Sequence, residues 1–402
     1  MKKNGSNKDK KHKGRFLSPS FKKGAVKEKP DSQDEFKINL MTFEDNPNSL
    51  EPSNKSSKNK EEINTNSIKK KENGKIQKKD SGQLNITDKV NVFPEGHIKS
   101  VSSQSQAGKN EDGLPKVNQD SYLVIQNEYE LPDFNIFSVL DGHGEYGHLV
   151  SRFITKYFTT FFKKNKKMKV LKSEDEVYCR LKKNDYDIIK KVFRHAEKDI
   201  SISLIDAEYS GSTCVMIFQI GDKIICANVG DSRAIMVKGE KGKHIIPLSI
   251  DQKPTDPEEK KRIESSGGEI SQYEEDGEKS GPYRVWAKGQ TYPGIAMSRS
   301  IGDFVATKLG VIPEPICLEY TIDKDTKFII IASDGIWEFL SNKKVVHIVL
   351  PFYENKDSDG ACKALIKEAT EWWNKEDIVV DDITVIVIFF KVCFINSFIL
   401  VL

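Results

Sequence analysis

Seven short runs of strand-forming apolar residues recur along this chain, and aspartates stand directly beside several of them. The runs cover residues 121–125, 134–140, 213–220, 223–229, 233–237, 327–333 and 383–390. One Asp-Gly pair after a strand is ordinary turn chemistry. Carboxylates at the ends of several strands can instead meet at one edge of a sandwich, where they would repel each other without cations. The pattern therefore favours a fold in which these strand ends converge.

Helical patterns fill the intervals between these runs. Residues 147–163 and 175–204 carry apolar residues at spacings of three and four, which is typical of amphipathic helices. Residues 256–268 place Pro in a first turn and end on Gly, and residues 343–353 and 361–375 form two further helical segments. Many antiparallel-type strands with helices grouped between them favour an α+β sandwich over a βαβ repeat.

The first 90 residues have a different composition from the rest. They are rich in Lys, Asn, Ser, Asp and Glu and nearly lack periodic apolar residues, so we predict a disordered N-terminal extension. They contain no apolar leader segment, and the six cysteines of the chain form no C-x-x-C pair. Both features favour reduced thiols in a cytoplasmic and/or nuclear protein.

The C-terminal residues 383–402 are apolar enough to suggest a membrane span. However, Asp381 and Asp382 border this segment and Lys391 interrupts it. The remainder, residues 391–402, is shorter than the roughly 20 residues that a spanning helix needs. We expect a core strand followed by an apolar tail, with a tail anchor as the alternative.

Five aspartates stand at the ends of apolar runs, namely Asp120, Asp141, Asp231, Asp334 and Asp381. Oxygen ligands with no Cys or His pair at metal spacing favour a hard cation, Mg²⁺ or Mn²⁺, over Zn²⁺. Gly142, directly after Asp141, would let the backbone carbonyl approach such a cation closely. Asp231 lies in a Gly-Asp-Ser-Arg turn, and we expect its carboxylate to bind turn amides instead.

Eight motifs follow one another along the chain: NQDSY, VLDGHG, SGSTC, ANVGDSRAIM, DQKPTDPEEKKRI, PGIAMSRSIGDF, ASDGIWEFL and DDITVIVI. Their order strongly resembles the metal-dependent serine/threonine protein phosphatases of the PP2C (PPM) family. The resemblance defines one phosphatase domain over residues 91–390, between the extension 1–90 and the tail 391–402. It implies a four-layer α/β/β/α sandwich of two antiparallel sheets flanked by helices, in agreement with the strand pattern.

The resemblance also implies a metal-ligand set, Asp120, Asp141, Gly142, Asp334 and Asp381. Asp141 would bridge two divalent cations, and Gly142 would bind through its carbonyl oxygen. Asp120 would serve the second metal directly or through water. The neighbouring Asp382 leaves the register of the last ligand open by one residue.

Four other positions gain candidate roles from the resemblance. His143 is the candidate general acid for the leaving alkoxide, with loop orientation as the alternative. Pro115 stands where many members carry a phosphate-binding Arg, so Lys116 is a candidate to bind phosphate as a point charge. Asp303 is a candidate for an additional metal or for support of the site, with helix capping as the alternative. Glu208 stands where some members place a third-metal aspartate.

Two regions depart from the family pattern or vary within it. Gln119 is neutral where many members carry Glu beside the first aspartate. Residues 269–292 are polar and poorly periodic, which predicts a surface loop beside the catalytic groove. Arg284 and Trp286 are either substrate contacts in this loop or incidental surface residues.

Two cations close together lower the pKa of a shared water and neutralise phosphoryl oxygens, so that hydroxide attacks phosphorus in line without a phosphoenzyme. The expected substrates are phosphoserine and phosphothreonine proteins, and we expect a monomer. One rival is an inactive relative that uses the fold as a binding module, but the metal-binding aspartates are all present. Another is a nucleic-acid binder led by its basic arm, which interspersed acidic residues disfavour.

Overall fold

The computed structural model describes residues 96–391. The predicted N-terminal extension (1–90) and all but the first residue of the predicted tail (391–402) lie outside the described residues. The first half of the apolar C-terminal segment lies inside them and forms a buried strand, as predicted.

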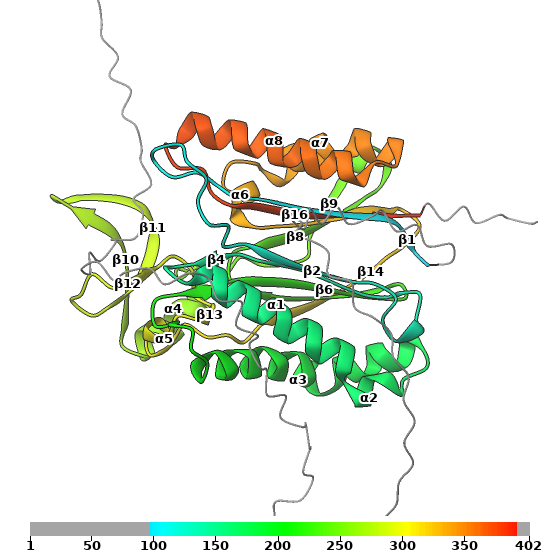
Figure 1. Cartoon of the computed structure of the whole chain (residues 1–402), viewed down its shortest axis with the longest axis horizontal. Coiled ribbons are helices and arrows are strands. Elements are labelled where there is room, and N and C mark those ends of the chain that lie inside the picture. Colours follow the sequence, from blue (N-terminus) through cyan, green and yellow to red (C-terminus); the bar gives the residue numbers. More distant parts are fainter. Residues whose placement is uncertain (1–95, 392–402) are drawn as a thin grey trace, which may run out of the picture. The chain divides into compact units, whose positions relative to one another are not determined.

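Two five-stranded antiparallel sheets form the centre of the domain (Figure 1). The first sheet has the order β1 (Ile98–Gln106), β16 (Ile383–Phe390), β15 (Thr326–Ala332), β8 (Arg233–Lys238) and β9 (His244–Pro247). The second has the order β14 (Ile316–Thr321), β7 (Lys223–Val229), β6 (Cys214–Ile220), β3 (Phe134–Leu140) and β2 (Ser121–Ile125). All seven apolar runs are therefore strands. Strands β1, β9 and β14 were not predicted from the sequence, because their exposed faces carry many polar residues.

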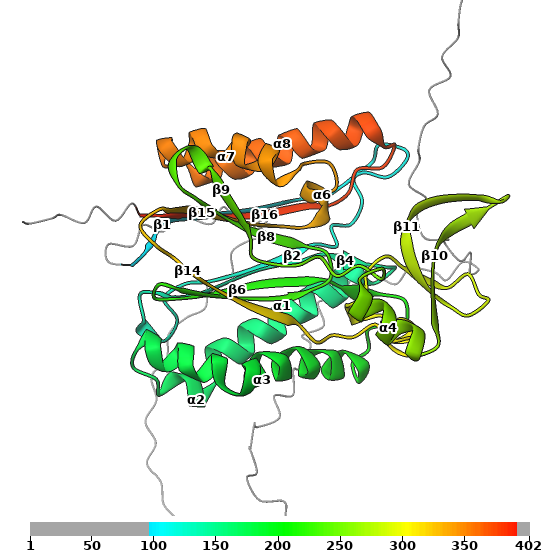
Figure 2. The ribbon, with the colours of Figure 1, turned by 180° about the vertical axis from the view of Figure 1, so that it is seen from behind.

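Helices cover the outer face of each sheet, as both views show (Figures 1 and 2). The first sheet is covered by α7 (Asn342–Asn355) and α8 (Ser358–Glu376). The second is covered by α1 (Gly147–Lys164) and α3 (Glu174–Ser201), with the short α2 (Lys166–Lys169) between them. The predicted four-layer α/β/β/α sandwich is therefore confirmed.

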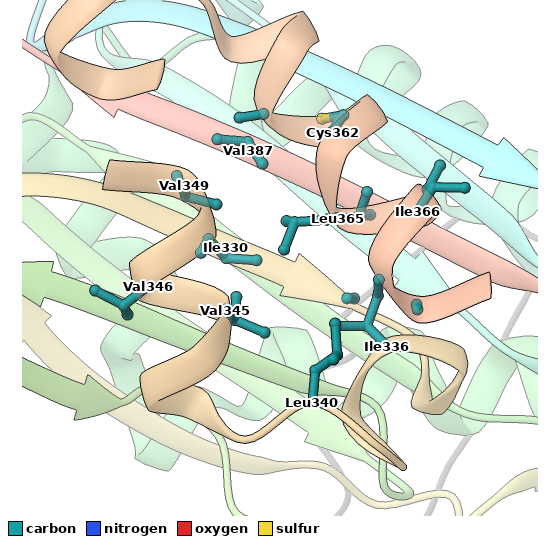
Figure 3. Close-up of a cluster of buried hydrophobic side chains, with 14 of the residues drawn as sticks. Ile330, Ile336, Leu340, Val345, Val346, Val349, Cys362, Leu365, Ile366 and Val387 are labelled. Carbon is teal, nitrogen blue, oxygen red and sulfur yellow. The ribbon is translucent and has the colours of Figure 1, made fainter. Parts of the chain in front are cut away.

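Alternation along β15 and β16 divides the core into two layers. Ile329 and Ile331 face the second sheet, whereas Ile330 packs with Val349 and Leu365 beneath α7 and α8 (Figure 3). All of these side chains are fully buried. A strand with both faces buried reads as a continuous apolar run, and for this reason the sequence revealed it so clearly.

The strand register brings the aspartates to one edge. In the second sheet Ser121 at the start of β2 pairs with Leu140 at the end of β3, so Asp120 and Asp141 leave the sheet side by side. In the first sheet Ala332 at the end of β15 pairs with Val385 near the start of β16. In an antiparallel pair the end of one strand lies at the same edge as the start of its neighbour. The segments that carry Asp334 and Asp381 therefore also meet at one edge.

Two smaller sheets extend this edge. One consists of β13 (Ile301–Gly302), β5 (Gly211–Ser212) and β4 (Gly142–His143). The other consists of β10 (Gly268–Glu275), β11 (Glu278–Ala287) and β12 (Pro293–Ile295), and its hairpin extends away from the sandwich (Figures 1 and 2). Three short helices complete the domain: α4 (Pro257–Ser265), α5 (Phe304–Thr307) and α6 (Asp334–Trp337).

The prediction of an irregular loop over residues 269–292 was wrong, because most of this segment is the β10–β11 hairpin. Trp286 is only 7% exposed, and its indole N–H donates to the carbonyl of Ser271 at 3.0 Å. Arg284 donates to the carbonyl of Gly294 at 2.6 Å. Both side chains hold the small sheet together. Within residues 96–391, none of the helices has both the length and the apolar character needed to cross a bilayer.

A buried carboxylate joins α4 to the segment that leads into β13. Glu259 is 5% exposed and accepts two hydrogen bonds from Arg262, at 2.9 and 2.7 Å, and others from Arg299 and Ser298. Burial alone would raise the pKa of Glu259, but the two arginines outweigh it and lower the pKa to about 2.

We predict that Glu259→Gln destabilises the domain by on the order of 3 kcal/mol, because it leaves two arginines without their shared anion. The folded-state pKa is depressed below the ordinary 4.5. The stabilisation is therefore complete above about pH 4.5 and is lost as the pH falls towards 2. Urea unfolding at pH 7 and at pH 3 measures both effects. Glu264→Gln, which removes an exposed ion pair on the same helix, is the matched control, and an equal effect of both changes would contradict the account.

Candidate active site

Asp141 leaves β3 in a backbone position fixed by Thr213. Its N–H donates to Thr213 Oγ1 at 3.0 Å, and its carbonyl accepts from the Thr213 N–H at 2.9 Å. The pKa of the Asp141 carboxyl lies well above its ordinary value, because of burial and then because of the charges of Asp334, Asp120 and Asp381. The other three carboxylates therefore lie close enough to Asp141 to disfavour its ionisation.

Asp120 connects the two large sheets. Its Oδ2 accepts a hydrogen bond at 2.8 Å from the hydroxyl of Ser333, which in turn accepts from the N–H of Thr384 at 3.0 Å. Burial and the charge of Asp382 raise the pKa of Asp120 to about 8. Its Oδ1 is buried and has no hydrogen-bond partner among the described residues.

Asp381 and Asp382, between which the sequence left the register open, have different partners. Asp382 is 3% exposed and accepts hydrogen bonds from the N–H groups of Gly108, at 2.7 Å, and Gln119, at 2.9 Å. It therefore fixes the loop before β2. The Asp381 side chain is 36% exposed and pairs with Lys116, so Asp381 is the carboxylate that faces the site.

Glycine is required beside two of the aspartates. A Cβ at Gly142 would overlap the carbonyl oxygens of Gly147 and Gln119, and a Cβ at Gly335 would overlap the carbonyl of Asp382. The Asp-Gly pairs in the two motifs are thus explained by close backbone approach. They hold Asp141 and Asp334 at the shared edge.

Lys116 lies against the carboxylates. Its ammonium nitrogen is 2.7 Å from Asp381 Oδ1 and 3.6 Å from Asp382 Oδ2. Burial lowers the pKa of Lys116, but the two aspartates outweigh burial and raise it. The side chain that was predicted to bind phosphate is therefore engaged with the carboxylate cluster.

His143 is held by Asp303 across the small sheet. His143 Nε2 lies 2.6 Å from Asp303 Oδ2, and the same oxygen accepts from the hydroxyl of Ser300. Burial lowers the pKa of His143, but the charge and hydrogen bond of Asp303 outweigh it and raise the pKa. Asp303 makes no side-chain capping bond to α5, so the helix-capping alternative was wrong. The structure places Asp303 as the partner of the candidate acid.

Glu208 and Asp231 lie in surroundings that differ from those predicted. The Glu208 side chain is 52% exposed and lies 3.7 Å from Lys308, with no recorded contact to the carboxylate cluster among the described residues. Asp231 was expected to bind turn amides, but its carboxylate accepts from the ammonium of Lys253 at 2.6 Å. Lys253 lies in the DQKPTDP motif, and nothing else in the sequence indicated it as this partner.

The side-chain amide of Gln119 explains why this position is neutral. Its Nε2 donates to the carbonyl of Gly144 at 2.6 Å, while the backbone carbonyl of Gln119 accepts from the hydroxyl of Ser151. A glutamate carboxylate could not donate the first of these bonds. The neutral residue therefore links the loop before β2 to the loop that carries His143.

The donor set of this edge fits hard divalent cations. It offers four carboxylates, a buried Asp120 oxygen that lacks a partner, and the close-packed carbonyl of Gly142, and oxygen donors are what Mg²⁺ and Mn²⁺ prefer. Within residues 96–391, however, no three Asp, Glu, His or Cys side chains are already spaced to hold one ion. Asp120 Oδ2 is bonded to Ser333 and Asp381 Oδ1 to Lys116.

Comparison with known proteins agrees with this geometry. The family model for protein phosphatase 2C matches residues 97–378. "Probable protein phosphatase 2C 35" of Arabidopsis thaliana is 32% identical over 303 residues, which cover 71% of this chain and 82% of the relative. "Probable protein phosphatase 2C 72" of the same plant is 31% identical over 284 residues, which cover 69% of this chain and 83% of the relative.

A solved structure supports the fold. The serine-threonine phosphatase 2C of Toxoplasma gondii superimposes with a TM-score of 0.59 at 18% identity, covering 75% of this chain and 99% of that one. The chain therefore belongs to the protein phosphatase 2C family. It is a protein serine/threonine phosphatase, which confirms the activity that its motifs predicted.

We predict that Lys116→Met makes the domain less stable without metal and more responsive to Mn²⁺. The ammonium compensates carboxylate charge, and a metal ion must compete with it for Asp381. Melting curves in EDTA and at increasing Mn²⁺ measure both effects, with Lys116→Arg as the charge-preserving control. The same Mn²⁺-induced rise in melting temperature in wild type and Lys116→Met would contradict this role.

Proposed function

We propose that this phosphatase hydrolyses phosphoserine and phosphothreonine in proteins with the help of two divalent cations, Mg²⁺ or Mn²⁺. The observation that carries the proposal is the convergence of four carboxylates from two packed sheets, where the charges of Asp334, Asp120 and Asp381 raise the pKa of Asp141. Asp120, Asp141, Asp334, Asp381 and the carbonyl of Gly142 would hold the cations. The cations, when bound, would activate water and neutralise the phosphoryl oxygens.

The remaining chemistry belongs to residues of the chain. His143 lies next to the Asp141–Gly142 turn. Its Nε2 is held by Asp303, and its Nδ1 is buried with no hydrogen-bond partner among the described residues, so Nδ1 is the nitrogen that would donate to a leaving oxygen inside the site. Asp303 favours the protonated imidazole and fixes the ring through one nitrogen. His143 would therefore give its proton to the departing serine or threonine oxygen. A third metal at Glu208 is not part of the proposal, because that side chain points to Lys308.

The binding-module alternative gains no support from the site. A protein that had lost catalysis would have no need to keep four mutually repelling carboxylates at one edge, since such a cluster destabilises the metal-free fold. We also propose the cytoplasm and/or the nucleus as the compartment, because the five cysteines of the described part are free thiols.

Asp141→Asn should abolish turnover with Mn²⁺ and leave the domain folded. The change removes charge from the centre of the cluster, so the melting temperature in EDTA should stay equal or rise as repulsion falls. Phosphopeptide hydrolysis with and without Mn²⁺, together with melting curves, provides the measurement. Asp359→Asn, which alters an exposed carboxylate bonded to Gln104 and Lys363, is the control. Near-normal turnover in Asp141→Asn would defeat the proposal.

His143→Ala should slow hydrolysis of a phosphothreonine peptide by roughly 10²–10⁴-fold. Hydrolysis of p-nitrophenyl phosphate should slow much less, because its leaving group needs little protonation. Asp303→Asn should shift the two rates in the same direction by a smaller factor. Steady-state rates on both substrates test this contrast, and an equal loss on both would assign His143 to loop orientation instead.

A further inference from the structure

Large apolar side chains with high exposure are concentrated at the carboxylate edge. Nine such side chains are at least 49% exposed within residues 96–391, namely Leu114, Val117, Val170, Ile202, Leu204, Tyr209, Ile250, Tyr283 and Ile378. Leu114 and Val117 lie on the segment before Asp120, Ile378 shortly precedes Asp381, and Ile202, Leu204 and Tyr209 lie on the loop before β5. Single exposed apolar residues are common, but six of these nine lie on segments that run into the active site, which calls for a function.

One group lies on the two segments that also carry Lys116 and Asp381. Lys109 forms backbone bridges to Pro115 on one side and to Val380 on the other, with hydrogen bonds to Val380 of 2.9 and 3.0 Å. Leu114 and Ile378 therefore lie on the two segments that flank Lys109, and they are 60% and 73% exposed. With Val117, also 60% exposed, they form what we call the first apolar rim.

A second group lies on the loop between α3 and β5. Ile202 is 71% exposed and Leu204 98%, while the ring of Tyr209 packs edge-to-face against Tyr292 at 6.4 Å. This loop runs directly into β5, which pairs with β4 so that Gly211 lies opposite His143. We call Ile202, Leu204 and Tyr209 the second apolar rim. The two rims thus continue the loops that carry the metal-binding and proton-donating residues.

We propose that the two rims bind large apolar side chains that flank the phosphoresidue in an extended segment of the substrate protein. The inference rests on the proposed function, because a substrate can reach the carboxylates only past these loops. An extended peptide advances about 3.3 Å per residue, so residues a few positions from the phosphate come over the surrounding loops. Burial of apolar surface then favours association. The enzyme accordingly selects phosphosites with aliphatic or aromatic neighbours.

The hairpin offers a competing preference. Its tip carries Glu274, Glu275, Asp276 and Glu278, which would attract phosphosites flanked by Lys or Arg. These acids lie at the far end of the hairpin, and Lys279 approaches Glu274 at 3.8 Å. The rims, in contrast, lie within a few residues of Lys116, Asp381 and β5. Position therefore favours apolar selection over basic selection.

The test uses the full chain with Mn²⁺ and three phosphothreonine peptides of equal length. Their flanking residues are Leu and Ile in the first, Ser and Gly in the second, and Lys and Arg in the third. We expect KM for the apolar peptide to be about tenfold lower than for the other two. A tenfold change corresponds to the binding free energy gained by burying about one apolar side chain. The lowest KM for the basic peptide, or equal values for all three, would overturn the inference.

Variants locate the effect. Leu114→Ser with Ile378→Ser, and separately Ile202→Ser with Leu204→Ser, should raise KM for the apolar peptide by about tenfold and leave p-nitrophenyl phosphate hydrolysis unchanged. Val170→Ser, 69% exposed and remote from this edge, should change neither. An unchanged KM in both double variants would overturn the inference while the phosphatase activity stands. Absence of Mn²⁺-dependent p-nitrophenyl phosphate hydrolysis in the wild type would instead overturn the proposed function, and this inference with it.

Discussion

Repulsion among carboxylates that are held together at one edge is the constraint on which the rest of this structure depends. Asp120 and Asp141 leave one sheet, while Asp334 and Asp381 lie at the matching end of the other. The pKa values of Asp120 and Asp141 rise because burial and neighbouring charges both penalise the ionised form. A fold tolerates this cost only if the backbone around the carboxylates is held firmly and a cation is available.

The surroundings of the cluster meet both conditions. Thr213 fixes the backbone of Asp141, Ser333 ties Asp120 to the start of β16, and Asp382 binds two N–H groups of the loop before β2. These contacts use hydroxyls and a buried carboxylate that are themselves fully engaged. Lys116 supplies a cation from within the chain. The backbone around the site is thus held by hydrogen bonds that do not involve the Asp141 carboxylate.

The sequence predicted the sandwich well, because its buried strands leave local patterns, whereas the ligand roles of the aspartates stay a prediction. β15 and β16 are buried on both faces and read as apolar runs, and the Asp-Gly turns that follow strands are compulsory where the backbone passes so closely. Contacts between distant segments left no such pattern. The pairing of Lys116 with Asp381 spans 265 residues and that of His143 with Asp303 spans 160. The β10–β11 hairpin was missed because most of its residues are polar and only partly buried, so that its few apolar residues leave no clear alternation.

Anomalous scattering from crystals of the full chain grown with Mn²⁺ tests the central claim most directly. The account predicts Mn²⁺ peaks bound by Asp141 together with Asp334, Asp381 or the carbonyl of Gly142, and it predicts that Lys116 no longer contacts the Asp381 oxygen that binds metal. Peaks confined to other parts of the surface, with Asp381 still paired to Lys116, would contradict the claim that this carboxylate cluster exists to hold divalent cations.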